Sequence, residues 1–320
     1  MKKLAIYFSN PKPMGDPFDL RYPYWQIYKE IIRNVEKQGI DVYVTRAKDS
    51  YLGKGVFTHG WKVDGKQLIE INEQITVDLI FHRGSQATIP ATYDCPIINH
   101  PDLERFCGDK IKVNQVFADI SPKTKAINSY QEYRDTIKEW NFNPEDKIVV
   151  KKNFLYGGHG VYIRPIKEIT ESLYENWRDI LMQEFVDSSG GIPGIVEGLH
   201  DIRVVTINGE PVYSFVRTPP VGSFLANVSQ GGAEKAVPLS QLPAELLQLV
   251  ERVNKELAQY RPSIFASDFF NSKNGFKLIE LNSRPAVCDP AQSPETRNYI
   301  DKIIQLLVNT INNSFKMEKN

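Results

Sequence analysis

The sequence has few cysteines, no excess of either charge and no long apolar run. Its three cysteines, Cys95, Cys107 and Cys288, are widely spaced and odd in number, which excludes a Cys-x-x-Cys metal motif and a disulfide framework. A reduced, cytoplasmic setting is therefore expected. Lysine plus arginine and aspartate plus glutamate both number 39, so no net basic field would attract nucleic acid or an anionic membrane surface. No apolar run approaches the length of a membrane span, and the first one stops at Ser9, too early for a signal-peptide core.

The composition that remains is globular, with 41% hydrophobic and 24% charged residues in a chain of 320, enough for two or three packed units. In the first hundred residues, short apolar runs that predict strands alternate with a helical pattern at 25–35. These runs lie at 4–8, 41–45, 78–82 and 96–99. They predict an open α/β unit of roughly a hundred residues. Ligands of such sheets bind beyond the carboxyl ends of the strands, so the candidate substrate contacts are His82, Arg83, Gly84 and Ser85.

Helices and strands follow in mixed order behind this unit. Asp109 and Lys110 begin a helical pattern within 103–117. Further strands are expected at 124–127, 147–151, 180–186, 200–207 and 212–217, and further helices at 131–140, 243–260 and 296–311. The pair Asn208-Gly209 predicts a tight hairpin. The run Gly-Gly-Ile-Pro-Gly at 190–194 predicts a linker or mobile connection.

A glycine-rich run lies between two of these strands. Gly157, Gly158 and Gly160 can turn the chain so that backbone N–H groups point at phosphate oxygens. The run is neither a Walker loop nor a dinucleotide fingerprint, because it lacks Gly-Lys-Ser/Thr and does not lead from a strand into a helix. An ordinary tight hairpin explains it equally well at this point.

Two short apolar segments near the end of the chain carry hard oxygen ligands. Segments 264–270 and 276–281 are separated by turn residues and predict an antiparallel hairpin. Glu280 and Asn282 are two residues apart, which places both side chains on one face of a strand, and Asp268 on the partner strand can face the same way. Two carboxylates and an amide oxygen suit Mg²⁺. The alternative is a surface hairpin whose acidic residues are simply solvated.

In this order the segments resemble the ATP-grasp superfamily, most closely its glutathione-synthetase-like and ribosomal-protein-glutamate-ligase-like (RimK-type) carboxylate–amine ligases. The matching segments are Asp109-Lys110, 148–151, 157–161, 182–186, 201–203, Asp268 and 280–282. The resemblance implies an α/β (α+β) chain with the ATP-grasp fold. It implies a pre-ATP-grasp α/β domain at 1–99, a central subdomain with a glycine-rich lid at 100–187, and a C-terminal subdomain with a metal site at 188–320.

The resemblance also implies roles for individual residues. The implied nucleotide-binding residues form three groups. They are the two lysines Lys110 and Lys151, the glycine lid with Gly157, Gly158 and Gly160, and the segment that meets adenine, with Gln183, Glu184, Phe185 and Val186. The implied ligands of Mg²⁺, with Mn²⁺ as an alternative, are Asp268, Glu280 and Asn282. The implied catalytic residues are Arg203 and Lys151, with Arg217 and Asn227 beside them, and the substrate candidates are Arg83, Ser85, Arg217 and Arg284. His159 inside the glycine turn and Arg284-Pro285 after Asn282 depart from many members and leave the substrate open.

The activity implied is an ATP-dependent ligase that joins a carboxylate to an amine through an acyl phosphate. A small amino acid or short peptide is one candidate substrate, and a ribosomally made peptide or protein tail is another. Two other classes stay open, namely a catalytically silent ATP-binding regulatory module and a transferase with a hydroxyl or thiol acceptor. The sequence leaves open whether the protein is a homodimer, the commonest soluble assembly.

Overall fold

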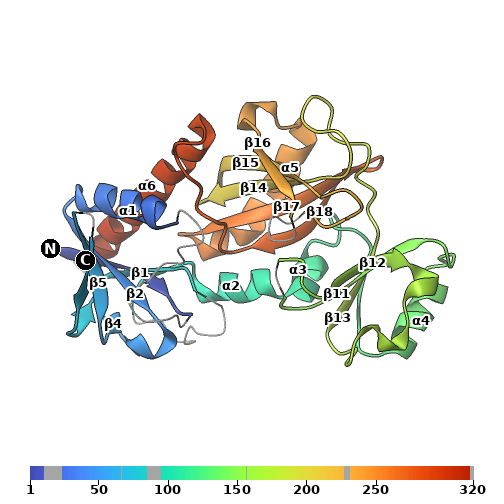
Figure 1. Ribbon diagram of the computed structural model, residues 1–320, viewed down its shortest axis with the longest axis horizontal. Coiled ribbons are helices and arrows are strands. Elements are labelled where there is room, and N and C mark those ends of the chain that lie inside the picture. The colour runs from blue at the N-terminus through green and yellow to red at the C-terminus, as the bar shows by residue number, and fades with distance from the viewer. Residues whose placement is uncertain (11–23, 66, 85–94, 156, 227–230, 318–320) are drawn as a thin grey trace.

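The computed structural model describes residues 1–10, 24–65, 67–84, 95–155, 157–226 and 231–317. Figure 1 shows an N-terminal unit (blue) and a central unit (green) at opposite ends of the molecule, with a C-terminal sheet (orange) between and above them. Ser85 and Asn227, both predicted site residues, lie outside the described residues. None of the helices in these ranges is both long enough and apolar enough to cross a membrane.

The N-terminal unit is built on a six-stranded sheet in the order β6-β5-β2-β1-β8-β9. Its strands are β1 (Lys2–Phe8), β2 (Ile40–Arg46), β5 (Gly60–Asp64), β6 (Gln67–Ile71), β8 (Leu79–His82) and β9 (Ile97–Ile98). Strand β1 is parallel to β2 and β8, and helix α1 (Tyr24–Glu36) packs on the sheet. The expected strands and helix are therefore confirmed. A second, three-stranded sheet of β3 (Tyr51–Gly53), β4 (Val56–Phe57) and β7 (Ile75–Thr76), like β5 and β6, has no counterpart among the predictions.

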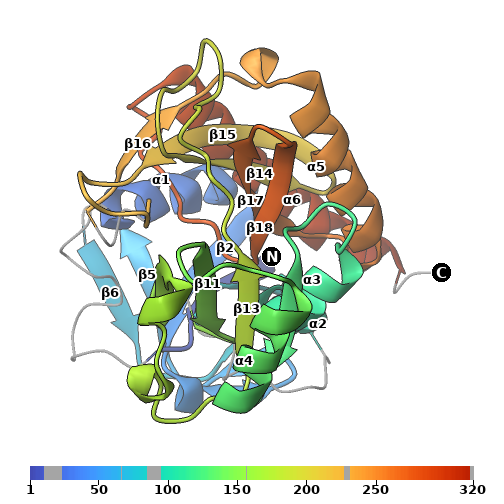
Figure 2. The same cartoon turned by 90° about the vertical axis from the view of Figure 1, so that its right-hand side faces the viewer.

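The central unit has a four-stranded antiparallel sheet in the order β10-β13-β11-β12. Its elements are β10 (Thr124–Ile127), α4 (Tyr130–Glu139), β11 (Lys147–Lys152), β12 (Val161–Pro165) and β13 (Ile180–Glu184), with short 3-10 turns at Ile166–Glu168 and Glu171–Leu173. Apolar side chains of the sheet and α4 form a core of their own around Trp140 and Trp177. Figure 2 shows this unit in front of the C-terminal sheet.

The C-terminal sheet has five antiparallel strands in the order β16-β15-β14-β17-β18. The strands are β14 (Asp201–Ile207), β15 (Glu210–Thr218), β16 (Ala233–Ala236), β17 (Ile264–Ser272) and β18 (Gly275–Asn282). One face packs on α2 (Pro101–Gly108), α3 (Lys110–Val116), α5 (Ala244–Glu256) and the 3-10 turn Leu257–Tyr260. Another 3-10 turn, Leu239–Gln241, precedes α5 in the chain. The predicted helix that begins at Asp109 and Lys110 is α3, and α2 before it has no counterpart among the predictions. The two helices meet at Asp109 and pack on this sheet, although they precede the central unit in the chain.

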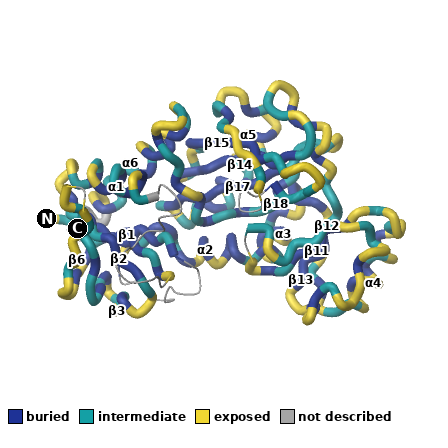
Figure 3. The backbone as a smooth tube through the Cα atoms, viewed as in Figure 1, coloured by how far each residue is buried: buried dark blue, intermediate teal, exposed yellow. Residues whose placement is uncertain are grey.

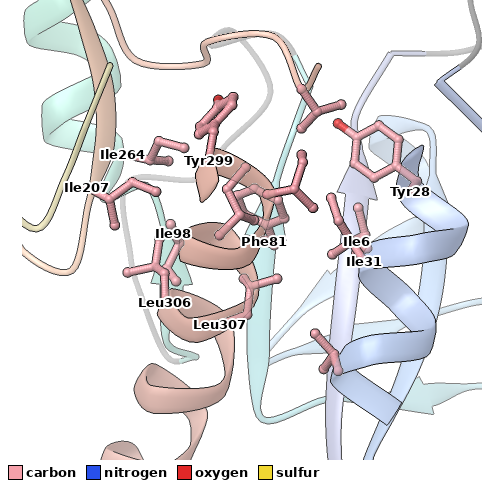
Figure 4. Close-up of a cluster of buried hydrophobic side chains, with 14 of the residues drawn as sticks. Ile6, Tyr28, Ile31, Phe81, Ile98, Ile207, Ile264, Tyr299, Leu306 and Leu307 are labelled. Carbon is pink, nitrogen blue, oxygen red and sulfur yellow. The ribbon is translucent and has the colours of Figure 1, made fainter. Parts of the chain in front are cut away.

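The other face of the C-terminal sheet shares one core with the N-terminal unit. Helix α6 (Pro294–Met317) lies between them and contributes Tyr299, Leu306 and Leu307, which pack near Phe81 of β8 and Ile264 of β17 (Figure 4). Figure 3 shows buried backbone running from the N-terminal strands through α2 into the C-terminal sheet, while exposed residues gather on the outer loops of the central unit. The N-terminal unit and the C-terminal sheet are therefore packed as one body, and the central unit has a separate core.

The glycine-rich run after β13 is not the mobile linker that the sequence predicts. Ile192 is buried at 1% exposure and pairs with Val196 in an isolated β-bridge. Asn271 on β17 donates its side-chain N–H to the Gly191 carbonyl at 2.9 Å. The glycines allow a tight fold-back of the chain, because Gly191 has a φ of +71° and a Cβ there would lie 2.3 Å from the Val196 carbonyl oxygen. The segment is a packed part of the C-terminal unit.

Candidate active site

The first predicted nucleotide lysine, Lys110, is the first residue of α3. Asp109 caps this helix by accepting a hydrogen bond from the Lys112 N–H. Asn153, just after β11, accepts from the Lys110 N–H at 2.7 Å and donates to Asp109 at 2.8 Å. The Lys110 side chain is buried, donates to the Leu155 carbonyl and lies 3.2 Å from Glu280 Oε1. Lys110 therefore joins three segments, namely α3, the turn after β11 and strand β18.

The second lysine, Lys151, lies near the end of β11 and is also buried. Its ammonium donates to Gln183 Oε1 at 3.2 Å. Burial lowers the pKa of Lys151 to about 8, a shift that Glu280 opposes and the positive charge of Lys110 increases. The two lysines and Glu280 therefore act on one another electrostatically in a single site.

Asp268 lies at the centre of a buried network of charges. Both of its oxygens accept hydrogen bonds from Arg203 at 2.6 Å, and Arg217 adds a third at 2.8 Å. Arg217 in turn pairs with Asp201 through two bonds of 2.7 and 2.9 Å. Burial alone would raise the pKa of Asp268, but the two guanidinium groups outweigh it and hold that pKa below its usual range. Asp268 is an anion at neutral pH.

The residues predicted to bind metal come from two paired strands. Asp268 on β17 lies directly opposite Glu280 on β18, and Asn282 is opposite Ala266 two positions along the ladder. Asn282 Oδ1 accepts a hydrogen bond from the Arg284 N–H at 2.8 Å. Among the described residues no three His, Cys, Asp or Glu side chains gather as a metal site. Two carboxylates and one amide oxygen nevertheless fit Mg²⁺, which usually takes one or two carboxylates and completes its shell with water and phosphate oxygens.

The glycine run turns the chain between β11 and β12. Gly157, Gly158 and Gly160 have φ values of +67°, +78° and +66°, the left-handed region that favours glycine. The Gly160 carbonyl accepts hydrogen bonds from the Lys152 N–H and the Tyr174 hydroxyl. The run is thus a hairpin connection, as the sequence predicts, with its C-terminal side tied to the central unit.

The segment predicted to meet adenine leaves the central sheet at the end of β13. The Glu184 N–H donates to the Lys123 carbonyl, and the Glu184 carboxylate accepts a hydrogen bond from the Lys123 N–H. The Phe185 ring packs edge-on against Phe224 at 5.4 Å, with the Lys147 ammonium over both rings. Glu184, Phe185 and Val186 line a cavity of about 610 Å³ together with the tip of the β17–β18 hairpin. Gln183, by contrast, lies in a strand paired on both sides, and its side chain is turned to Lys151.

Two of the predicted substrate arginines, Arg83 and Arg284, lie where the N-terminal unit meets the loop after β18, whereas the third, Arg217, is buried against Asp201 and Asp268. Arg83 donates to the Tyr28 hydroxyl at 3.0 Å and to the Pro285 carbonyl at 2.7 Å. Arg284, one residue before Pro285, is half-buried. Arg83 thus holds that loop against the N-terminal unit.

Sequence reasoning assigned no role to several buried polar residues around this site. Asp201 stands in a matching segment but had no assigned role, and Asn153 had none either. His82, predicted as a candidate substrate contact, instead lies in a buried hydrogen-bonded chain in which it contacts Ser9 at 3.1 Å and Glu104 at 3.0 Å. Each of these three side chains is 1% exposed or less, so they join β1, β8 and α2 internally. Polar residues that end apolar strand patterns were the available signal.

The three-unit arrangement has known counterparts among solved structures. A structure of the ATP-grasp ligase PsnB complexed with a minimal precursor has a TM-score of 0.60 and 13% identity, covering 98% of this chain and 99% of that one. D-alanine–D-alanine ligase from Bacillus anthracis has a TM-score of 0.62 and 15% identity, covering 99% and 100%. The fold is therefore the ATP-grasp fold, as the resemblance implied.

The sequence gives the family within that fold. The pattern of the RimK-like ATP-grasp domain matches residues 107–307, more than half of the chain, so the protein belongs to this family. A probable alpha-L-glutamate ligase of Parasynechococcus marenigrum (strain WH8102) is 27% identical over 198 residues, or 60% of this chain and 39% of that protein. Glutathione synthetase of Yersinia pestis is 30% identical over 168 residues, or 50% and 48%. The chain thus spans about half or less of the length of these curated relatives.

Proposed function

We propose that this protein is an ATP-dependent carboxylate–amine ligase that forms an amide bond and releases ADP and phosphate. The observation that carries the proposal is the meeting of Lys110, Lys151 and Glu280 beside Asp268, because these four charges come from separate segments of the chain. Buried charges that perturb one another are typical of functional sites. The names of the relatives, glutamate ligase and glutathione synthetase, agree with this class of reaction.

The chemistry requires an activated acid. A carboxylate does not acylate an amine directly, since oxide would have to leave. Transfer of the γ-phosphoryl group of ATP to a carboxylate oxygen gives an acyl phosphate and ADP. The amine nitrogen then attacks the acyl carbon, the carbon–oxygen bond to phosphate breaks, and the amine loses a proton.

The residues of this site match these steps. Lys110 and Lys151 supply compact positive charges for the phosphate oxygens. In the proposal Arg203, which is bonded to Asp268, stabilises the negative charge of the acyl phosphate and its tetrahedral adduct, and Arg217 fixes Asp268 beside it. Mg²⁺, or Mn²⁺ in its place, would be held by the oxygens of Asp268, Glu280 and Asn282 and would neutralise charge on the transferred phosphoryl group. In the proposal the glycine turn 157–160 covers the phosphates and keeps water from the acyl phosphate.

The acid and the amine are proposed to be amino acids or short peptides. Arg284 bonds to Asn282 through its N–H, Arg83 donates to the Pro285 carbonyl in the same loop, and both carry the charge that a free carboxylate requires. A peptide or protein tail is the second candidate acceptor, and the solved complex of a Chryseobacterium gregarium ATP-grasp ligase with ADP and a leader and core peptide supports it. We place the reaction in the cytoplasm, since Cys95, Cys107 and Cys288 are all free thiols.

The test is Mg²⁺-dependent ADP release from the purified protein against a panel of amino acids, dipeptides and peptides. Wild type should release ADP with one pair of acid and amine, and Glu280→Gln should reduce that release about 100-fold, because a carboxylate ligand of the metal is lost. The matched control is Glu168→Gln, which makes the same change at an exposed position and should leave the rate unchanged. Full activity in Glu280→Gln would refute the assigned metal site, and failure to bind ATP would refute the ligase itself.

A further inference from the structure

Gln183 and Asn114 form a buried chain of amide groups between the two lysines. The Lys151 ammonium donates to Gln183 Oε1 at 3.2 Å, and Gln183 Nε2 donates to Asn114 Oδ1 at 3.2 Å. Asn114 Nδ2 then donates to the Lys110 carbonyl at 2.8 Å. Gln183 is 2% exposed and Asn114 is 5% exposed. The chain therefore connects Lys151 on β11 to the helix α3 that begins with Lys110.

The direction of every bond in this chain is fixed by chemistry. An ammonium group can only donate, so Lys151 must face the oxygen of Gln183 and not its nitrogen. A backbone carbonyl can only accept, so Lys110 must face the nitrogen of Asn114. The remaining nitrogen of Gln183 and oxygen of Asn114 then meet as donor and acceptor. The Thr124 hydroxyl oxygen accepts a second bond from Gln183 at 3.0 Å, and its single hydrogen is shared between the Pro122 carbonyl at 2.7 Å and Asn114 Oδ1 at 3.1 Å.

Gln183 is also the sole acceptor for the Lys151 ammonium among the residues that the structure describes. A lysine side chain has four flexible carbons, so an acceptor is needed to hold the ammonium in one place. The acceptor is a neutral amide, which orients the ammonium without cancelling its charge. A carboxylate in the same place would form an ion pair that the phosphates of a nucleotide would have to displace.

From these contacts we propose that Gln183 and Asn114 are positioning residues, which hold the Lys151 ammonium and helix α3 at a fixed separation so that both lysines meet the phosphates together. The inference rests on the proposed function, because it assumes that the two lysines bind phosphate. It differs from the role that the family resemblance implies for Gln183, which is contact with adenine. The two roles predict different losses with different nucleotides.

The experiment compares binding of the Mg²⁺ complex of AMP-PNP, a non-hydrolysable ATP analogue, with binding of AMP by isothermal titration calorimetry. Gln183→Met keeps the length of the side chain and removes its amide. This variant should bind AMP-PNP about tenfold more weakly, the loss expected for a hydrogen bond to a charged group. Its affinity for AMP should change less than about twofold, because AMP lacks the β and γ phosphates. Gln131→Met, on the exposed surface of α4, is the matched control and should behave as wild type.

Asn114→Ala is the second variant, and it carries the test if Gln183→Met does not fold. It should weaken AMP-PNP binding about threefold while AMP binding is kept, since it removes the support of Gln183 and not the acceptor itself. Equal weakening for AMP and AMP-PNP would make Gln183 a base contact or a packing residue and would overturn the inference, as would unchanged AMP-PNP binding. Absence of AMP-PNP binding to the wild-type protein would instead remove the proposed function.

Discussion

Lys151 shows at the scale of one residue how a binding site can cost stability. Its ammonium is buried and has a neutral acceptor, so its pKa falls from 10.5 to about 8. The unfolded chain keeps the ordinary pKa and binds more protons than the folded protein between pH 8 and pH 10.5. The free energy of unfolding therefore increases as the pH rises through that window. Below pH 8 the full cost of burying the charged Lys151 ammonium is present.

We expect Lys151→Met to be more stable than wild type at pH 7, because an apolar side chain of similar length replaces the buried ammonium. The gain is on the order of 3 kcal/mol at most, from 1.36 kcal/mol for each pKa unit, and it should shrink as the pH rises from 8 towards 10.5. Urea unfolding at pH 7 and at about pH 9.5 measures both values. A variant that is less stable than wild type at pH 7 would contradict the assigned burial cost.

Single residues also show what the sequence could not reveal about the site. The order of Lys110, Lys151, Glu280 and Asn282 could be read because each stands in a recognisable local pattern. The pairing of Arg203 and Arg217 with Asp268 could not be foreseen in this way, although both arginines were named, because it depends on the register of β14 with β15 and β17. Side-chain direction in a sheet follows from pairing, and pairing is a long-range property.

At the scale of the element, the junction of α2 and α3 is set by one residue, Asp109. Asp109 ends one helix and caps the next, and it also accepts a hydrogen bond from Asn153. One side chain thus sets the start of α3, and with it the position of Lys110. The sequence pattern predicted that a helix begins at Asp109 and Lys110, but not that another helix ends there, because the eight residues of α2 are too few for a clear helical period.

Asp109→Ala should lower the free energy of unfolding by about 1–2 kcal/mol, the usual cost of losing a helix cap. It should also weaken AMP-PNP binding, since α3 then loses its tie to Asn153. Chemical denaturation and calorimetry check the two effects. Asp109→Asn keeps an accepting oxygen and is expected to retain most of the stability; if it is as damaging as Asp109→Ala, the negative charge and not the cap is what matters.

Short elements were the least predictable part of the fold. The described residues between 51 and 76 form five strands of two to five residues, interrupted by turns that include Gly55 and Gly65. A strand of two residues is too short to show an alternation of apolar and polar residues, so the sequence pattern cannot predict it. The longer strands and helices were predicted because their burial pattern repeats over at least one full turn or several alternations.

At the scale of the whole molecule, one shared core explains how the N-terminal unit and the C-terminal sheet are joined. Tyr299 on α6 is fully buried, stacks on Tyr213 of β15 at 5.3 Å and donates its hydroxyl to the Ala286 carbonyl at 3.1 Å. It belongs to the core shared by the N-terminal unit and the C-terminal sheet. The amphipathic pattern of α6 predicted that one face is buried but not which units it would join.

Tyr299→Ala should cost about 3–5 kcal/mol, as expected for removing a large buried aromatic side chain. Amide hydrogen exchange should then accelerate in β1 and in β14 together, while β13 in the central unit changes little. Tyr299→Phe, which removes the hydroxyl alone, should cost about 1 kcal/mol. Faster exchange confined to the C-terminal sheet would show that the shared core does not couple the two units.

The position of α6 also has a consequence for synthesis on the ribosome. Strand β1 ends at Phe8, whereas α6, which completes the core beside it, begins at Pro294. At the usual elongation rates of about 5–20 residues per second, the two are separated by roughly 15–60 s. Throughout that interval part of the apolar face around β1 and β8 has no partner, so this unit is made early but cannot finish folding until α6 follows. Chaperones that shield apolar surface would therefore act on this part of the nascent chain.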